Sequence, residues 1–158
     1  MYTFGLEEDM QAFISFVEAR NGSFMQLPMW AAVKSNWTPL LFSGRRDGAL
    51  VLTCLVLTRK IPVSGTLWYI PNGFVCDYAD ERLVEQFTSF LKGEMRSRGA
   101  FACVIDPDIP LRIDGAVQPA AEKTAALLAR CGFQPNPDRN NYTYQPSLTA
   151  MLELSETD

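Results

Sequence analysis

Apolar residues recur with a helical period near the start of the chain. Met10, Phe13, Ile14 and Val17 lie about one turn apart, which predicts a helix over Leu6–Arg20 with one buried face. The Asn-Gly pair that follows is typical of a helix end. Similar patterns predict helices over Pro28–Ser35, Glu81–Arg98 (with Asp80 as its N-cap) and Glu122–Cys131.

Runs of aliphatic and β-branched residues predict strands between these helices. Asp47-Gly48 separates two such runs, Pro39–Arg46 and Ala49–Arg59, and Asp-Gly in this setting signals a hairpin. The second run is almost continuously apolar, as expected of a central strand that is covered on both faces. Further strands are expected at Thr66–Ile70, Phe101–Ile105, Tyr142–Gln145 and Leu148–Leu154.

The order of these elements predicts one α/β (α+β) domain over residues 1–158. A mixed sheet with an antiparallel first half and helices on its faces would satisfy that order. The length of 158 residues and the 47% content of hydrophobic residues suit a single folded core.

Charge and hydropathy narrow the functional class. The net charge of −4 comes without a basic run, so composition does not signal a nucleic-acid-binding surface. No apolar run is long enough to span a membrane, and the N-terminus is acidic where a signal peptide would be basic. We therefore expect a cytoplasmic protein.

The residues suited to metal or redox chemistry are few. The chain has no histidine, which removes the commonest general base and metal ligand. The cysteines form no CxxC pair and each lies in or beside an apolar segment, so we expect small buried hydrophobes and neither a metal site nor a cofactor. They are Cys54, Cys76, Cys103 and Cys131.

The stretch with the most side chains suited to ligand binding is Gly65–Tyr78, where the turn Pro71-Asn72-Gly73 connects a predicted strand to a predicted helix. Ligand groups often lie at such junctions, because backbone donors and strand-end side chains converge there. Trp68 and Tyr69 alternate across the strand, so one is expected in the core while the other can line a groove.

Several short motifs, in order from Ser23 to Leu154, carry a resemblance to a known family. Phe24–Trp30 (FMQLPMW) with the downstream Lys34 resembles its "Phe-x-Gln-Ser-x-x-Trp" opening, and Tyr69–Val75 (YIPNGFV) resembles its "Tyr-x-Pro-Arg-Gly-Pro" segment. Three later motifs of the family also have similar segments in this chain: Ile105-Asp106-Pro107, Cys131-Gly132-Phe133 and the C-terminal segment from Gln145-Pro146 to Leu154. The chain thus resembles the Fem family of non-ribosomal peptidyltransferases, which implies a fold of the acyl-CoA N-acetyltransferase (GNAT) type.

The resemblance implies a function as well as a fold. Fem enzymes transfer amino acids from aminoacyl-tRNA to the stem peptide of peptidoglycan precursors, and the peptide amine attacks the aminoacyl ester without a metal. Family members usually carry a second domain of the same fold. This chain is therefore expected to be the N-terminal half, which binds a UDP-linked or lipid-linked muramyl-peptide. The other domain would bind the aminoacyl-tRNA.

The resemblance also suggests site residues, although each has a simpler structural explanation. Lys34 would help to hold the precursor diphosphate, or it is a solvated helix lysine. Asp77 would line the cleft, or it only shapes a turn. Asp106 and Asp108 would supply paired carboxylates, or they are surface turn acids. No catalytic residue is assigned, and the candidate substrate-binding residues are Trp30, Lys34, Tyr69, Asn72, Gly73, Asp77, Tyr78 and Asp106.

The match departs from the family pattern at the central turn, and two other functions stay open. Asn72 and Phe74 replace an Arg and a Pro, so an anion contact made by that Arg is not expected here.

A non-catalytic GNAT-like interaction module, which would form homo-oligomers, is one alternative function. An acyl-CoA N-acyltransferase is another, but its phosphate-binding loop has its nearest match in Arg96–Phe101, at a helix C-terminus where the dipole repels anions.

Overall fold

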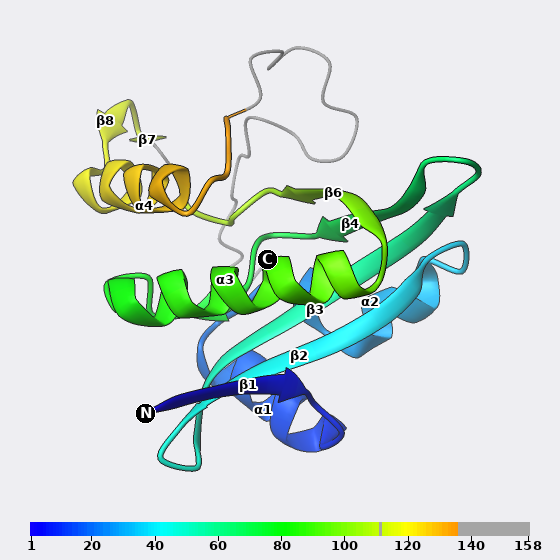
Figure 1. Cartoon of the computed structure of the whole chain (residues 1–158). Coiled ribbons are helices and arrows are strands. Elements are labelled where there is room, and N and C mark those ends of the chain that lie inside the picture. Colours follow the sequence, from blue (N-terminus) through cyan, green and yellow to red (C-terminus); the bar gives the residue numbers. More distant parts are fainter. Residues whose placement is uncertain (111, 136–158) are drawn as a thin grey trace, which may run out of the picture.

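The computed structural model of this chain describes residues 1–110 and 112–135. Figure 1 shows a twisted sheet with helices on both sides. In chain order the elements are β1 (Tyr2–Leu6), α1 (Met10–Ala19), the 3-10 turn η1 (Phe24–Gln26), α2 (Pro28–Val33), β2 (Thr38–Arg46), β3 (Ala49–Ile61), β4 (Gly65–Ile70), β5 (Val75–Cys76), α3 (Glu81–Ser97), β6 (Ala100–Ile105), β7 (Arg112–Ile113), β8 (Ala116–Val117) and α4 (Pro119–Arg130).

The predicted mixed sheet is confirmed. Its strands run in the order β1-β2-β3-β4-β6, and β5 also pairs with β3. The pairs from β1 to β4 are antiparallel, whereas β4 and β6 are parallel and are joined through α3. The β2–β3 hairpin turns at Asp47 (φ 52°) and Gly48 (φ 86°), the left-handed pair of angles that favours Asp-Gly.

The two faces of the sheet carry separate cores. On one face, α3 and α4 cover a large aromatic core that includes Phe42, Trp68 and Phe87. On the other face, α1 and α2 cover a smaller core around Phe13 and Tyr69. β3 lies in the middle and is buried from both sides, as its apolar run predicted.

The first strand, β1, was not predicted, and the first helix begins at Met10 instead of Leu6. Phe4 of β1 packs on Phe87 and Phe90 of α3, with ring centroids 5.7 Å apart in both cases. Asp9 then starts α1, because its side chain accepts a hydrogen bond from the Ala12 N–H. Antiparallel pairing with β2 makes this short segment a strand, and the contact of Phe4 with α3 holds it against the core.

Other boundaries differ from the prediction by a few residues. α4 begins at Pro119, three residues early, because proline suits the first helical turn. The short strand β5 and the β7–β8 hairpin were missed, since strands of two residues have no detectable period. Asp80 caps α3 as predicted. The strands expected at 142–145 and 148–154 lie outside the described residues.

The cysteines pack largely as expected. Cys54 and Cys131 are buried, while Cys76 and Cys103 are partly buried. Burial raises the pKa of the Cys103 thiol to about 12 and raises the pKa values of Cys54 and Cys76 as well. These three thiols are therefore protonated and poor nucleophiles near neutral pH.

Candidate functional site

The site begins at the turn that follows β4. Asn72 and Gly73 both have left-handed backbone angles (φ 55° and 71°), and the Gly73 N–H donates to the Ile70 carbonyl over 3.3 Å. A Cβ atom at Gly73 would lie 2.9 Å from the Tyr78 Oη and 3.0 Å from the Pro107 Cα. Both the angle and the lack of space therefore require glycine here.

Asp106, at the end of β6, holds this turn from the side. Its Oδ1 accepts from the Asn72 N–H and its Oδ2 accepts from the Tyr69 hydroxyl, both over 2.9 Å. The Asp108 N–H also donates to the Asn72 carbonyl over 3.3 Å. Because β4 and β6 are parallel neighbours, their ends meet, and three predicted site residues come together.

Burial raises the pKa of Asp106, and hydrogen bonds from the Tyr69 hydroxyl, the Asn72 N–H and its own backbone N–H counteract this only in part. The nearby charge of Asp108 raises the pKa slightly further. Asp108 itself is exposed. Asp106 therefore faces the turn as a positioning group, while Asp108 is a surface residue.

Gln26 of η1 also supports this turn. It was not among the site residues predicted from the sequence. It is fully buried, and its Nε2 donates to the Pro71 carbonyl over 2.5 Å. Its Oε1 accepts from the Leu55 N–H over 2.8 Å. A glutamine within an apolar segment was the available signal, because a buried amide needs several partners.

An aromatic side chain and a cation extend the site along the α1–α2 face. The Trp37 ring lies 6.1 Å from the Tyr69 ring, and the Arg59 guanidinium lies 6.0 Å from the Trp37 centroid. Neither Trp37 nor Arg59 was among the predicted site residues. Their proximity follows from the β2–β3 register, in which Thr38 pairs with Thr58.

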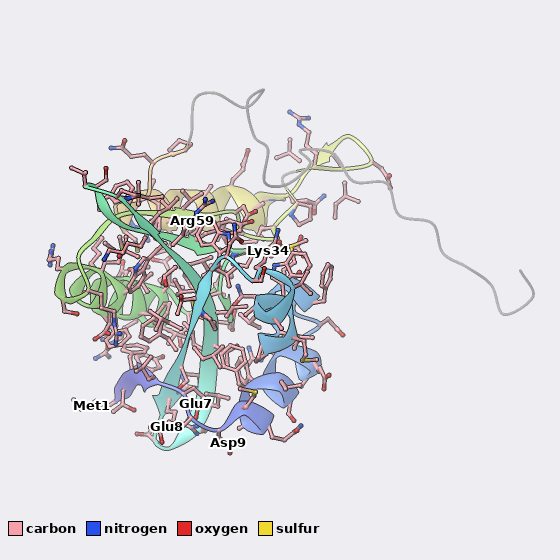
Figure 2. The ribbon with its side chains drawn as sticks, turned by 90° about the vertical axis from the view of Figure 1, so that its right-hand side faces the viewer. Met1, Glu7, Glu8, Asp9, Lys34 and Arg59 are labelled. Carbon is pink, nitrogen blue, oxygen red and sulfur yellow. The ribbon has the colours of Figure 1, made fainter. Side chains whose placement is uncertain are left out.

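Lys34 and Trp30 complete this surface. The Lys34 Nζ lies 4.9 Å from the centroid of the Trp30 ring, and the Lys34 carbonyl accepts from the Trp37 N–H over 2.8 Å. Lys34 forms no ion pair with any residue of the described ranges. Figure 2 shows Lys34 and Arg59 well apart from Glu7, Glu8 and Asp9.

Two polar atoms of this region are buried without a hydrogen-bond partner among the described residues. They are the Trp30 Nε1 and the Asn72 Oδ1. Buried polar atoms are rarely left unpaired in folded proteins. A buried donor and a buried acceptor without a described partner thus lie in the region of Lys34 and the turn.

The structure does not bring Asp77 into this cluster. Its exposed side chain accepts from the Ala79 N–H over 2.9 Å, which is the turn role considered from sequence. Tyr78 lies against the site through Gly73, but its hydroxyl donates to the Phe74 carbonyl and its ring stacks on Phe74. Burial raises the pKa of Tyr78, so this residue is a neutral packing group.

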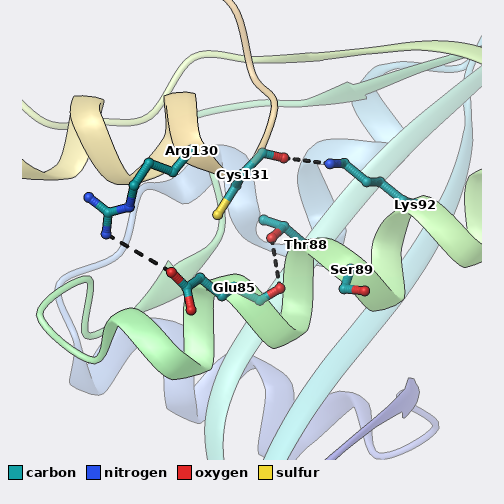
Figure 3. Close-up of a pocket in the computed structure, with 6 residues that line it drawn as sticks. All are labelled: Glu85, Thr88, Ser89, Lys92, Arg130 and Cys131. Carbon is teal, nitrogen blue, oxygen red and sulfur yellow. Dashed lines mark hydrogen bonds and ion pairs between the residues drawn. The ribbon is translucent and has the colours of Figure 1, made fainter.

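A separate cavity of about 250 Å³ lies between α3 and α4, on the opposite face of the sheet (Figure 3). Its polar groups are already paired: Arg130 contacts Glu81 over 2.6 Å, and the Lys92 Nζ donates to the Cys131 carbonyl over 2.6 Å. Nothing in its lining calls for a ligand. Within residues 1–110 and 112–135 no group of three carboxylate or thiol side chains is placed to hold a metal ion.

Comparison with known proteins identifies the family to which this arrangement belongs. The FemAB family matches residues 7–158. The chain belongs to the FemAB family. The resemblance proposed from the sequence motifs is therefore confirmed.

The curated relatives of this FemAB chain are longer proteins. The lipid II:glycine glycyltransferase of Staphylococcus haemolyticus (strain JCSC1435) is 29% identical over 148 residues, covering 91% of this chain and 34% of the relative. The protein of the same name from Staphylococcus saprophyticus subsp. saprophyticus is 28% identical over 152 residues, covering 94% and 36%. The chain spans about a third of the length of these relatives.

Solved structures confirm the fold. FemX superimposes with a TM-score of 0.67 at 26% identity, over 81% of this chain and 31% of FemX. Glucosamine-6-phosphate N-acetyltransferase from Arabidopsis thaliana superimposes with a TM-score of 0.58 at 12% identity, over 92% of this chain and 99% of that enzyme. The second likeness concerns the fold alone, and together they confirm the predicted GNAT-like architecture.

Proposed function

We propose that this chain recognises a muramyl-peptide precursor of peptidoglycan, linked to UDP or to a lipid, for aminoacyl transfer from aminoacyl-tRNA. It would form the N-terminal, precursor-binding part of a Fem-type transferase. The observation that carries the proposal is the series of contacts from Lys34 through Trp37 and the buried Tyr69 to Asn72 and Asp106, in a chain of the FemAB family. Because aminoacyl-tRNA is cytoplasmic, this step would take place on the cytoplasmic side.

The cations of this surface suit the diphosphate of such a precursor. Lys34 makes no ion pair with a described residue, and Arg59 lies nearby over Trp37. A lysine supplies a point charge, whereas an arginine can bind a phosphate through two N–H groups. Together, Lys34 and Arg59 offer a phosphate group more positive charge and more hydrogen-bond donors than a single surface lysine would.

The helix α2 and the turn each provide a group for the sugar or the peptide. The Trp30 Nε1 can donate and the Asn72 Oδ1 can accept, and each lacks a partner among the described residues. Asp106 and Gln26 hold the backbone of the turn from two sides, so that these groups are positioned before the ligand arrives.

The chemistry of the transfer needs no metal. The amine of the stem peptide attacks the carbonyl carbon of the aminoacyl ester, a C–N bond forms, and the C–O bond to the tRNA ribose breaks. The proton lost by the amine ends on the departing ribose oxygen. Positioning of the two substrates would supply much of the rate. We assign no catalytic residue in this chain.

Binding of acetyl-CoA is less well supported than binding of the precursor. A pyrophosphate would need free amides at a helix N-terminus. At α3, the helix that follows β4, Asp80 already accepts from the Leu83 N–H and brings a negative charge of its own. Gly99 follows the C-terminus of α3, as the sequence indicated.

Calorimetric titration with UDP-muramyl-pentapeptide tests this proposal. We expect saturable binding that weakens about tenfold in Lys34→Ala and in Arg59→Ala, since each loses a charge-assisted contact. Lys60→Ala is the matched control, because adjacent strand residues point to opposite faces. Equal affinity in all three variants would contradict the assigned site.

Acetyl-CoA serves as the competing ligand in the same experiment. Tight binding of acetyl-CoA would favour an N-acyltransferase instead. Binding of neither ligand, together with concentration-dependent self-association, would favour a non-catalytic interaction module.

A further inference from the structure

The η1–α2 segment carries an exposed apolar surface that the site itself does not use. Phe24, Met29 and Val33 are 60%, 56% and 68% exposed. Met29 and Val33 are one helical turn apart, so they lie on the same side of α2, and Phe24 packs edge-on against Trp30 at 5.4 Å. We call Phe24, Met29 and Val33 the apolar cap.

Basic residues lie beside the apolar cap although the whole chain has a net charge of −4. Of the six Lys and Arg residues in 19–76, Arg45 and Arg46 lie with Asp47 at the tip of the β2–β3 hairpin, at the opposite end of both strands from Trp37 and Arg59. Lys34 follows Val33 directly, and Arg20 lies four residues before Phe24. Glu18 is the nearest acid in sequence.

The acidic residues that precede α1 lie apart from Lys34 and Arg59. Figure 2 shows Glu7, Glu8 and Asp9 on one side and Lys34 with Arg59 on the other. A molecule with such a charge distribution orients in the field of an anionic surface, with its cationic end toward that surface.

We propose that the apolar cap docks this protein on an anionic lipid bilayer. Exposed Phe, Met and Val side chains beside Lys and Arg are the combination that binds at the headgroup–acyl boundary. The choice of occupant rests on the proposed function, because a lipid-linked precursor presents its diphosphate at the depth of the headgroups. Lys34 immediately follows the cap, so docking would bring it to that depth.

This mode of binding is peripheral. None of the helices within the described residues is long and apolar enough to cross a bilayer. The cap inserts only a few side chains, so the attachment is reversible and depends on both the apolar residues and the cations.

Vesicle flotation tests the proposal with the 158-residue chain and no precursor. Vesicles of phosphatidylglycerol and phosphatidylcholine are compared with vesicles of phosphatidylcholine alone. We expect binding to the anionic vesicles, and about a tenfold loss of binding in the triple variant Phe24→Ser, Met29→Ser, Val33→Ser. High salt should also weaken the binding.

The chain offers a matched control with the same number of exposed apolar residues elsewhere. Phe101, Ile113 and Val117 are 53%, 50% and 43% exposed and lie on β6 and the β7–β8 hairpin. The triple variant Phe101→Ser, Ile113→Ser, Val117→Ser should bind vesicles as the unchanged chain does. Thermal unfolding of each variant verifies that the fold is retained.

Three outcomes would overturn the proposal: no preference for anionic vesicles, equal losses in the two triple variants, or a concentration-dependent dimer that the cap variant abolishes. The dimer would assign the cap to a second copy of the chain. UDP-muramyl-pentapeptide is soluble, so its affinity for the cap variant should be unchanged. If the unchanged chain binds the precursor but not the anionic vesicles, docking alone is refuted. If it binds the vesicles but not the precursor, the proposed function alone is refuted.

Discussion

The two faces of the central sheet bury different kinds of groups. The α3 face is built from interlocking aromatic rings, such as Phe74 and Phe87 with centroids 5.0 Å apart. The α1–α2 face has a smaller core and includes the fully buried Gln26 and the partly buried Asp106. Burial of polar groups costs stability unless they are paired. Gln26 and Asp106 are paired here, because both form hydrogen bonds to the turn at Pro71–Gly73 and so fix its conformation.

The cavity between α3 and α4 also differs from the candidate site at the turn. It is a hollow of about 250 Å³, but its arginine and lysine are used in contacts between the two helices. The surface around Lys34 and Asn72 is less enclosed, yet it has unpaired polar groups. The candidate site is thus distinguished by Lys34, which forms no ion pair with a described residue, and not by the presence of a cavity.

The largest effect is expected from breaking the aromatic face. Phe87 is fully buried and packs against Phe4 and Phe74, so Phe87→Ala should lower the free energy of unfolding by about 3–5 kcal/mol. Urea unfolding measures this change. Precursor affinity of the folded fraction should stay the same, and a selective loss of affinity would show that the two faces are coupled.

Removal of the buried amide should affect both stability and binding. Gln26→Leu leaves the Pro71 carbonyl and the Leu55 N–H without their partner, at a cost of about 2–3 kcal/mol. The precursor should also bind more weakly, because the turn loses one support. Thr88→Val is the control on the other face: its hydroxyl bonds only to its own helix, so binding should not change.

The pH dependence of stability should have opposite signs for two carboxylates. The raised pKa of Asp106 means that its contribution to folding becomes less favourable as the pH rises through the ordinary aspartate range. Burial tends to raise the pKa of Glu7, but hydrogen bonds from Ser43, Asp9 and Arg45 lower it overall. The contribution of Glu7 is therefore present above its ordinary value of 4.5 and is lost as the pH falls through the lower folded value.

Urea unfolding of the unchanged chain, Asp106→Asn and Glu7→Gln between about pH 3 and pH 7 measures these two contributions. The advantage of the unchanged chain should shrink with rising pH relative to Asp106→Asn and grow relative to Glu7→Gln. The same trend in both variants would contradict the assigned environments.

The smallest effect is expected in the cavity between the helices. Lys92→Met removes the hydrogen bond to the Cys131 carbonyl at the end of α4 and should cost about 0.5–1 kcal/mol. Precursor binding should be unchanged. A clear loss of affinity would indicate that the cavity, and not the turn, contacts the ligand.

Much of this architecture was predictable because local patterns agree with the tertiary structure. The apolar run of β3, the Asp47-Gly48 turn and the Asp80 cap each have a local cause. The strand β1 does not, since its place depends on Phe4 meeting rings of α3 that are distant in sequence.

The candidate site was predictable only in part for the same reason. The motifs indicated Tyr69, Asn72, Gly73 and Asp106, which lie together at the ends of β4 and β6. Arg59 was missed because its position next to Trp37 depends on the register shift at Gly44/Arg45 in β2. An irregularity of this kind cannot be located from residue types alone.

The most direct test of the account is to map the bound precursor on the chain by amide chemical shifts. On titration with UDP-muramyl-pentapeptide we expect the largest shifts at Lys34, Asn72 and Gly73. Dominant shifts at Thr88, Ser89 and Lys92, which line the α3–α4 cavity, would contradict the account.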